Sequence, residues 1–344
     1  MPSSTHTPPN HRTALRVLSG IQPSGRLHLG NYTGAVQQFL DLQEQGHDPF
    51  IFVATYHAMT TIDDAATLRD NVRAAATDYL AFGLDPDRCT LYLQQDVPAV
   101  TELAWILGCV CPKSQMDKAT TFKDKVAKGL SASIGLYTYP VLQAADILAV
   151  DPDLVPVGRD QAQHVEIARD LGQKFNRRVG DTVLKIPKLQ IREDAAVVPG
   201  IDGQKMSKSY GNTIDPFMDE KPLRKRIMKV VTDSAQPGDV KDPEASAVYQ
   251  IFSALAGADD PRTLDLAQRY REPARQGPDG FGYGHAKQAL FELVMDTFAE
   301  ARARRTTLEA DPGQVDEVLR AGAARANEMI AATLSRVRRA TGLD

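Results

Sequence analysis

Short, continuous runs of apolar residues alternate with amphipathic stretches along the first 214 of the 344 residues. A continuous apolar run is typical of a strand in a parallel sheet, because helices cover both faces of such a sheet. The intervening stretches repeat their apolar positions about every 3.6 residues, which indicates helices that bury one side. Strands that alternate with helices predict an α/β fold with a doubly wound parallel sheet. The predicted strands are residues 15–21, 49–54, 89–94, 154–158 and 184–187, and the predicted helices between them include residues 34–42, 65–82, 101–111 and 161–175.

The pattern changes near residue 215, where long amphipathic stretches replace the apolar runs. We therefore predict a doubly wound, Rossmann-like catalytic domain at residues 14–214 and an all-helical domain at residues 215–344. The last helix is a candidate for packing back on the first domain. Residues 1–13 are polar and rich in proline, and we expect them to form a disordered leader. The predicted helices of the second domain are residues 221–231, 245–256, 263–270, 284–305 and 313–341.

Composition excludes several classes of protein. Charged residues make up 24% of the chain and hydrophobic residues 42%, a balance that excludes a disordered or low-complexity chain. No uncharged apolar stretch approaches the roughly 18 residues of a membrane helix, and the N-terminus lacks the apolar segment of a secretory signal. The three cysteines, Cys89, Cys109 and Cys111, are too few for a disulfide framework, so we expect a reducing, cytoplasmic setting. The net charge of −4 excludes a polybasic binder but leaves room for a local basic patch that contacts nucleic acid.

The first candidate for chemistry is the segment of residues 19–31, which we call the first signature segment. A strand, a tight glycine turn and a helix start follow one another there, as in doubly wound sheets that bind ligands at the carboxyl ends of their strands. Gly25 and Gly30 allow the backbone to approach a ligand closely, and free N–H groups at a helix start favour an anion. His28 and Asn31 are three residues apart and can face one ligand. A capped helix with a surface histidine remains the alternative, since the G-x-G-x-x-G dinucleotide motif is absent.

The second candidate is the segment of residues 203–212, which we call the second signature segment. Lys205 and Lys208 stand three residues apart, with serine hydroxyls beside them and glycines at the flanks. Such a loop can clamp a polyphosphate, with lysine acting as a flexible point charge. Charge stabilisation of a pyrophosphate leaving group on loop closure would then be its main catalytic contribution. The alternative is a solvated lysine and serine loop.

Together the two segments resemble the paired signatures of class I aminoacyl-tRNA synthetases. The HIGH signature takes the form His28-Leu29-Gly30-Asn31, and KMSKS is intact at Lys205–Ser209. The resemblance narrows to the tryptophanyl-tRNA synthetase family, covers residues 15–343 and keeps the order of the family's motifs. The further matching segments are residues 20–25, 122–125, 135–148, 155–164, 231–234 and 282–284.

The resemblance implies a set of catalytic residues and a set of ATP-binding residues. The catalytic residues would be His28, Asn31, Lys205, Ser207 and Lys208. The ATP site would be lined by Gln22, Pro23, Ser24, Gly30 and Asn31, with Gly158, Arg159 and Asp160 near the ribose, Val198 at the adenine, and Lys205, Met206, Ser207, Lys208 and Ser209 around the phosphates.

The resemblance also implies a tryptophan pocket in which Asp146 accepts the indole N–H. A single donor facing a carboxylate makes physical sense, because a carboxylate is a strong acceptor. The remaining pocket residues would be His57, Tyr139, Gln143, Val155, Val157 and Gln161. A solvent-facing position for Asp146 and a buried structural role for His57 are the alternatives.

The implied reaction joins the tryptophan carboxylate to the α-phosphate of ATP and then transfers the tryptophanyl group to tRNA(Trp). Mg²⁺ would accompany ATP through phosphates and water, without protein ligands. The family also implies a homodimer, with its interface near residues 70–130, and a helical domain that meets the anticodon. Basic residues at 221–229 and 302–339 either contact phosphates or form a solvated helix face.

Gln143 departs from the family, whose bacterial members usually carry methionine at this position. An amide adds donors and an acceptor to an apolar pocket, at a cost unless they are paired. The pocket therefore either tolerates a tryptophan with a polar ring substituent or has drifted with compensating hydrogen bonds. Other functions left open are those of a tyrosyl-tRNA synthetase, a paralogue that serves a partner protein, and a small-molecule nucleotidyltransferase.

Overall fold

The computed structural model describes residues 14–118, 122, 126–127, 129–191, 198–273 and 280–344. The expected leader at residues 1–13 and the 123–125 part of one family motif lie outside the described residues. Among the described residues, no helix is long and apolar enough to cross a lipid bilayer.

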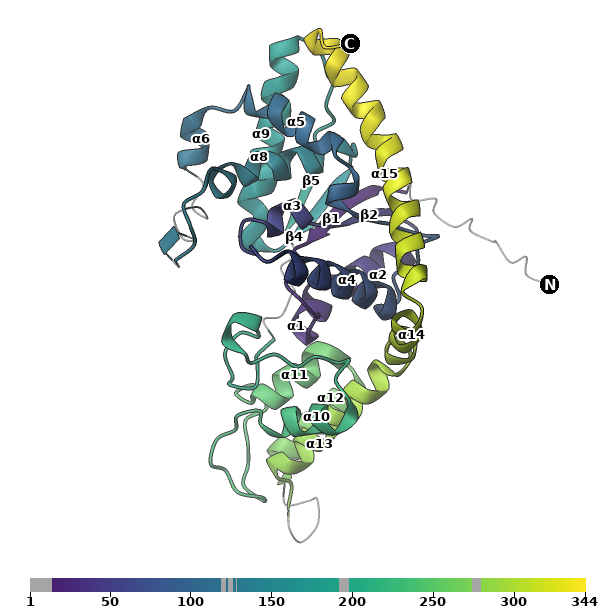
Figure 1. The fold of residues 1–344 in the computed structure, drawn as a ribbon. Helices are drawn as coiled ribbons and strands as arrows, with labels where there is room; N and C mark the ends of the chain where they lie inside the picture. The colour runs from purple at the N-terminus through teal and green to yellow at the C-terminus, as the bar shows by residue number, and fades with distance from the viewer. Residues whose placement is uncertain (1–13, 119–121, 123–125, 128, 192–197, 274–279) are drawn as a thin grey trace, which may run out of the picture.

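A five-stranded parallel sheet forms the centre of the N-terminal part, as the sequence predicted (Figure 1). The strands run in the order β3-β2-β1-β4-β5, so the order reverses direction between β1 and β4. They are β1 (Arg16–Ile21), β2 (Asp48–Val53), β3 (Thr90–Leu93), β4 (Leu154–Val157) and β5 (Lys188–Ile191).

The predicted strand at residues 184–187 was wrong, because β5 begins four residues later. Leu184 is fully buried, and its carbonyl accepts a hydrogen bond from Asn176 rather than from a strand. Pro187 has no N–H for a sheet ladder. The edge strand itself exposes Lys188 and Ile191 and therefore carries no apolar run in the sequence.

Side chains of the strands alternate between two apolar cores, one on each face of the sheet. Leu18, Phe50 and Phe52 point into the core shared by helices α5 (Ala99–Gly108), α8 (Ile134–Ala149) and α9 (Ala162–Val179). Ile51 points into the opposite core, which continues into the helical part of the chain. The helices of the sheet-containing part are α1 (Leu29–Asn31), α2 (Gln37–Glu44), α3 (Thr55–Ala58), α4 (Ala65–Phe82), α5 (Ala99–Gly108), α6 (Lys113–Asp117), α8 (Ile134–Ala149) and α9 (Ala162–Val179).

The C-terminal part consists of helices, of which α10 to α13 lie below the sheet in Figure 1. One predicted helix, at residues 284–305, is in fact two, which meet at Phe298. The Phe298 ring is buried against Tyr32 and Phe82, and this packing fixes the corner between the two helices. The helices are α10 (Glu220–Met228), α11 (Ala247–Ala256), α12 (Pro261–Arg271), α13 (Tyr283–Thr297), α14 (Ala299–Ala310) and α15 (Pro312–Thr341).

Helix α15 runs from the helical part along the β3 edge of the sheet (Figure 1). Its first half contributes Val315 and Leu319 to the core shared with the helical part. Its second half contributes Ile330 and Val337 to the core beneath α5 and α8. The last helix therefore joins both cores and covers the sheet edge at β3.

Replacing Gly322 of α15 by alanine will destabilise the fold, although alanine normally favours a helix. A Cβ at Gly322 would lie 1.9 Å from the carbonyl oxygen of Leu91, so α15 would have to move away from β3. We expect the free energy of unfolding, measured by urea denaturation, to fall by about 1–3 kcal/mol. Gly108→Ala is the matched control, since a Cβ at that helical glycine has no neighbour within 4 Å. An unchanged free energy for Gly322→Ala would show that α15 is not tightly packed on β3.

Candidate active site

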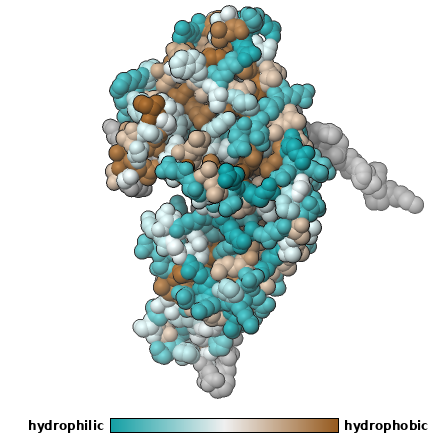
Figure 2. Space-filling model, in the orientation of Figure 1, coloured by the Kyte–Doolittle hydropathy of each residue, from teal (hydrophilic) through white to brown (hydrophobic). Residues whose placement is uncertain are grey.

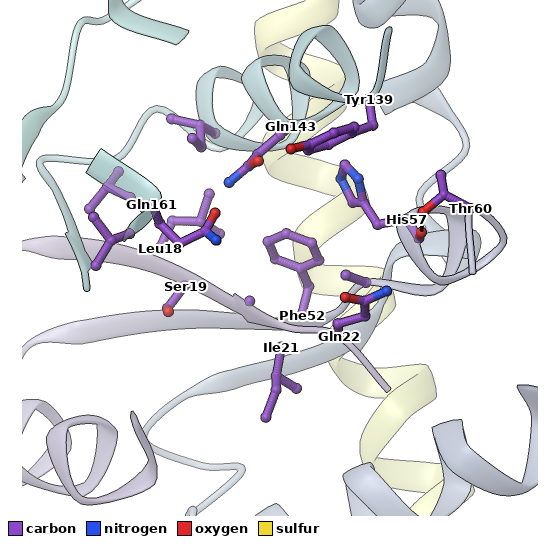
Figure 3. Close-up of a pocket in the computed structure, with 15 residues that line it drawn as sticks. Leu18, Ser19, Ile21, Gln22, Phe52, His57, Thr60, Tyr139, Gln143 and Gln161 are labelled. Atoms are coloured by element: carbon purple, nitrogen blue, oxygen red, sulfur yellow. Dashed lines mark hydrogen bonds between the residues drawn. The ribbon is translucent and has the colours of Figure 1, made fainter. Parts of the chain in front are cut away.

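A cavity of about 320 Å³ opens between β1 and β4, where the strand order reverses (Figure 3). Crevices at this point of a doubly wound sheet are the usual ligand sites, because the two neighbouring loops leave in opposite directions. Six of the seven predicted tryptophan-binding residues line the cavity. The lining consists of Leu18, Ser19, Gly20, Ile21, Gln22, Phe52, Ala54, His57, Thr60, Tyr139, Gln143, Ile147, Val155, Val157 and Gln161.

Gly20 shapes the floor of the cavity. A Cβ at this position would lie 2.6 Å from the ring of Phe52 on the neighbouring strand. The glycine therefore lets the Phe52 ring pack closely against β1 and form part of the cavity lining. Figure 3 shows this ring below His57 and Tyr139.

Asp146 is the predicted residue that does not line the cavity. It is 3% exposed, and both of its carboxylate oxygens accept hydrogen bonds. His57 Nε2 lies 2.8 Å from Oδ2, and Gln94 Nε2 lies 2.9 and 2.8 Å from Oδ1 and Oδ2. The solvent-facing alternative for Asp146 is thus wrong. His57 both lines the cavity and touches the carboxylate, so it connects Asp146 with the cavity wall.

Gln94 is a site residue that sequence reasoning missed. It follows β3, is fully buried, and its side-chain Oε1 accepts the Tyr56 N–H at 2.9 Å. The available signal was an amide at the end of the apolar run at residues 89–94. Nothing in the sequence shows that this amide meets a carboxylate 52 residues further along the chain.

Gln143 presents its amide to the cavity, as Figure 3 shows. The structure assigns this amide no hydrogen bond to any described residue. The position that departs from the family is therefore a polar group facing an otherwise largely apolar space.

The two signature segments meet in space. Lys208 Nζ donates hydrogen bonds to Ser24 Oγ at 3.2 Å and to the Gly25 carbonyl at 2.9 Å. The Leu29 N–H of the first segment donates to the carbonyl of Ile214, two residues after the second segment, at 2.9 Å. Because Gln22 of the same turn lines the cavity, the lysine of the second signature segment lies next to the cavity mouth.

The second signature segment is anchored from beneath by Asn212. This side chain is buried, accepts the Ser207 N–H at 2.8 Å and donates to Asp202 Oδ1 at 2.8 Å. Met206 is also buried, while Lys205 and Ser209 are exposed. The loop thus exposes one lysine and holds the other, Lys208, against the first signature segment.

Burial controls the charge of His28. Its removal from water and the nearby Lys208 ammonium lower its pKa from 6.5 to about 4, so the ring is neutral at pH 7. Its backbone N–H donates to Asn31 Oδ1 at 3.1 Å, which closes the helix start. The surface-histidine alternative is wrong, because His28 is 7% exposed.

Two acidic groups lie behind the signature segments. Burial raises the pKa of Asp78 to about 6, and the Arg305 guanidinium, 2.7 Å away, opposes this rise. Burial lowers the pKa of the Lys208 ammonium, and Asp78 and Asp215 oppose that change. No motif in the sequence predicts that these acidic groups face the lysine.

The remaining predicted ATP-binding residues lie in different environments. Gly158 and Arg159 are exposed in the turn after β4, and the Asp160 side chain lies outside what the structure describes. Val198 is 4% exposed and belongs to the core, where its carbonyl accepts the Met206 N–H. Pro23 is buried and Ser24 is exposed.

Comparison with known proteins places these features in one family. A family model described as tRNA synthetases class I (W and Y) matches residues 10–298. Tryptophan--tRNA ligases from Rhodopirellula baltica and Fusobacterium nucleatum are 48% and 43% identical, over 96% and 95% of this chain and 100% and 98% of their own lengths.

A solved structure of the Campylobacter jejuni tryptophanyl-tRNA synthetase, complexed with ADP and tryptophan, is 45% identical and has a TM-score of 0.87. The match covers 96% of this chain and 100% of that one. The solved structure of the tyrosyl-tRNA synthetase of Archaeoglobus fulgidus is 21% identical and has a TM-score of 0.61. This match covers 86% of this chain and 91% of that one, and at this identity it shows a shared fold alone.

Acid will destabilise the protein through His28. Its pKa is about 4 in the folded chain against 6.5 in a free histidine, so between these values only the unfolded chain gains a proton. The stability that neutral His28 contributes is therefore complete above pH 6.5 and is lost as the pH falls towards 4. Between about pH 7 and pH 4, the unfolding free energy of wild type should drop by about 2–3 kcal/mol more than that of His28→Asn in urea titrations. Parallel curves for the two proteins would contradict the assignment.

Proposed function

Because the chain belongs to the class I tRNA synthetases for tryptophan and tyrosine, and within them to the tryptophanyl-tRNA synthetases, we propose that it activates L-tryptophan with ATP at the cavity between β1 and β4. The tryptophanyl-adenylate is then used to charge tRNA(Trp). The observation that carries this proposal is the contact between Lys208 and the Ser24–Gly25 turn, which joins both signatures at the mouth of an indole-sized cavity.

The apolar wall of the cavity suits the indole ring. Phe52, Ile147 and Val155 offer the surface on which a flat aromatic ring loses little by leaving water. Asp146 accepts the indole N–H at the end of the cavity that His57 and Ile147 line. A carboxylate has about four acceptor positions, so the bonds from Gln94 and His57 leave room for one more donor.

Activation needs positioning and charge stabilisation more than a base, because the attacking carboxylate is already ionised. It attacks the α-phosphorus of ATP, and the bond to the bridging oxygen of pyrophosphate breaks. The Lys208 ammonium, with Lys205 and the hydroxyls of the second signature segment, stabilises the charge on the leaving pyrophosphate. A neutral His28 donates to a phosphate oxygen without repelling the lysine. Mg²⁺ enters with ATP as part of the substrate.

The first signature segment contributes the rest of the nucleotide site. Gln22, Ser24, Gly30 and Asn31 contact the phosphates and the adenosine, with Pro23 shaping the turn. The turn after β4, at residues 158–160, binds the ribose. The side chains of Val198 and Met206 are buried. We therefore propose that Val198 contacts the adenine, and Met206 the phosphates, through main-chain atoms.

The helical part at residues 215–344 is proposed to bind the anticodon of the tRNA. Exposed basic side chains on α10 and at its C-cap support phosphate contact, namely Lys221, Arg224, Lys225 and Lys229. We place the enzyme in the cytoplasm, where tRNA is charged. All three cysteines are free, which suits a reducing compartment.

We further propose a homodimer that uses the α5 region. Trp105 on α5 is 77% exposed, and Ile134 at the start of α8, which packs on α5, is equally exposed. Figure 2 shows apolar side chains at the surface of the sheet-containing half, where these helices lie. Exposed large apolar side chains of this kind favour association with a second copy.

Sedimentation velocity tests the dimer. Wild type should sediment with twice the chain mass of 37.6 kDa, and Trp105→Glu should shift it towards the monomer. Leu264→Glu is the matched control, because Leu264 is 56% exposed on α12, away from α5. A wild-type monomer at micromolar concentration would contradict the proposal.

Amino-acid-dependent exchange of pyrophosphate into ATP, without tRNA, tests the function. We expect exchange with tryptophan and not with tyrosine or phenylalanine, because only indole donates an N–H to Asp146. Asp146→Asn should reduce exchange by about 100-fold, since the charged acceptor is lost. Exchange with tyrosine would overturn the pocket, and no exchange at all would favour a non-catalytic paralogue.

The same assay addresses the exposed amide of Gln143. If the cavity is adapted to a tryptophan with a polar ring substituent, 5-hydroxytryptophan and 4-nitrotryptophan will exchange better than tryptophan in wild type, and Gln143→Met will reverse the order. The same preference in the two proteins would show that Gln143 does not adapt the cavity to a substituted tryptophan.

A further inference from the structure

The turn between β1 and α1 is held from behind by a buried carboxylate. Asp78, on α4, is fully buried, and its Oδ2 accepts the N–H of Leu27 at 2.7 Å. Leu27 stands between Gly25, whose carbonyl accepts a hydrogen bond from the Lys208 ammonium, and His28 at the helix start. The bond to Asp78 therefore fixes the part of the first signature segment that lies between its lysine contact and its helix.

The carboxylate is in turn held by the helical part of the chain. Nη1 of Arg305, on α14, lies 2.7 Å from Asp78 Oδ1, and the two side chains are 7% and 0% exposed. Arg305 has two further contacts, because its Nε donates to Glu309 at 3.1 Å and its guanidinium stacks over Phe217 at 4.7 Å. Helix α14 packs against α4 (Figure 1). The position of the guanidinium is thus set by α14 and Phe217, and Asp78 meets it there.

Stability alone does not account for a buried ion pair at this place. The attraction between two buried charges is about offset by the cost of removing them from water, so apolar side chains of similar volume often fill such a site equally well. An apolar pair could not accept the Leu27 N–H, however, and this N–H would then be buried without a partner. The carboxylate is therefore needed for the bond to the first signature segment, and Arg305 is needed to hold the carboxylate in the interior.

The Leu27 bond bears on the reaction through the neighbouring lysine contact. The Leu27 N–H and the Gly25 carbonyl belong to adjacent planar peptide units, so a shift of one moves the other. This carbonyl and Ser24 Oγ are the groups that hold the Lys208 ammonium. A misplacement of about 1 Å can cost about 100-fold in rate even when its origin lies far from the reacting atoms. Loss of the bond to Asp78 should therefore slow the step in which Lys208 acts.

Tryptophan binding should not depend on this bond. Leu27 belongs to the core on one face of the sheet. Phe52, Ile147 and Val155 of the cavity wall belong to the core on the opposite face. A change at Leu27 is therefore expected to affect the exchange of pyrophosphate and to leave the affinity for tryptophan nearly unchanged.

We propose that Asp78 and Arg305 are positioning residues for adenylate formation, which hold the Leu27 N–H and with it the first signature segment in place against Lys208. This inference deepens the proposed function and rests on it. It assigns to Asp78 and Arg305 no contact with ATP or tryptophan.

The test separates folding from positioning by replacing the ion pair with an apolar pair, Asp78→Leu with Arg305→Met. This double variant leaves no buried charge without a partner, so it should unfold at a higher temperature than either single variant. In pyrophosphate exchange its kcat should still lie at least about tenfold below that of wild type, because the Leu27 N–H has lost its acceptor. Tryptophan binding, measured by isothermal titration, should change by less than about twofold, because the cavity wall belongs to the opposite core.

A conservative pair, Asp78→Asn with Arg305→Gln, tests the bond itself. It also lacks both charges, but the amide oxygen introduced at position 78 accepts the Leu27 N–H, and the glutamine oxygen offers an acceptor to the NH₂ of that amide. Its kcat should therefore lie at least about threefold above that of the apolar pair.

Glu309→Gln is the matched control. It removes a half-exposed carboxylate from the same guanidinium and does not touch the first signature segment. Exchange by this variant should equal that of wild type. A loss as large as that of the apolar pair would overturn the proposal, because it would show that any change around Arg305 has the same effect.

Recovery of both thermal stability and exchange in the apolar pair would also overturn the proposal and leave the ion pair a structural feature. So would a loss of tryptophan binding as large as the loss of exchange, or a conservative pair no more active than the apolar pair. If the apolar pair fails to fold, Asp78→Ala with Arg305→Ala, which likewise lacks an acceptor, takes its place. Failure of the proposed function is distinguishable, because wild type would then show no exchange with tryptophan.

Discussion

The buried carboxylate of Asp78 joins three parts of the molecule. One oxygen lies 2.7 Å from Nη1 of Arg305 on α14, and the other accepts the Leu27 N–H at 2.7 Å, immediately before His28. Asp78 is fully buried, and an unpaired charge there would cost several kcal/mol. The Asp78 carboxylate must therefore stay bonded to Arg305 and to the Leu27 N–H. These bonds hold the helical part, the sheet-containing part and the first signature segment in one arrangement. Arg305 is fixed in turn by stacking over Phe217 at 4.7 Å.

The chemistry of the site depends on this arrangement. With the first signature segment fixed at Leu27, its turn offers Ser24 and Gly25 to Lys208 of the second signature segment. The lysine is drawn out of water while His28 beside it is kept neutral. One positive charge, on the flexible Lys208 side chain, thus lies at the cavity mouth. Because this ammonium is already partly removed from water, its interaction with a bound polyphosphate costs little further desolvation.

The cavity wall follows a second rule, which is that buried polar groups occur in satisfied sets. Asp146 is paired with Gln94 and His57, and Tyr139 is paired with Gln161 through His164. Each set fixes the direction of its donors and acceptors. Gln143 is the contrasting case, since it stands in the same wall and has no described partner. Its amide can therefore form hydrogen bonds with a ligand in the cavity.

The sequence by itself determined the parallel sheet, the positions of four of its five strands, the helical C-terminal part and six tryptophan-pocket residues that line the cavity. Each has a local signal, because apolar periodicity and short motifs are written in neighbouring residues. The position of the fifth strand was not predicted, because an exposed edge strand has no apolar run. The corner at Phe298 was not predicted either, because a buried ring can end a helix without proline or glycine. Only the tertiary structure decided that Gln94 meets Asp146, that Arg305 meets Asp78 and that His164 connects Tyr139 with Gln161. These pairs lie 52, 227 and about 25 residues apart, and no local pattern encodes a contact between side chains that the folding of the whole chain brings together.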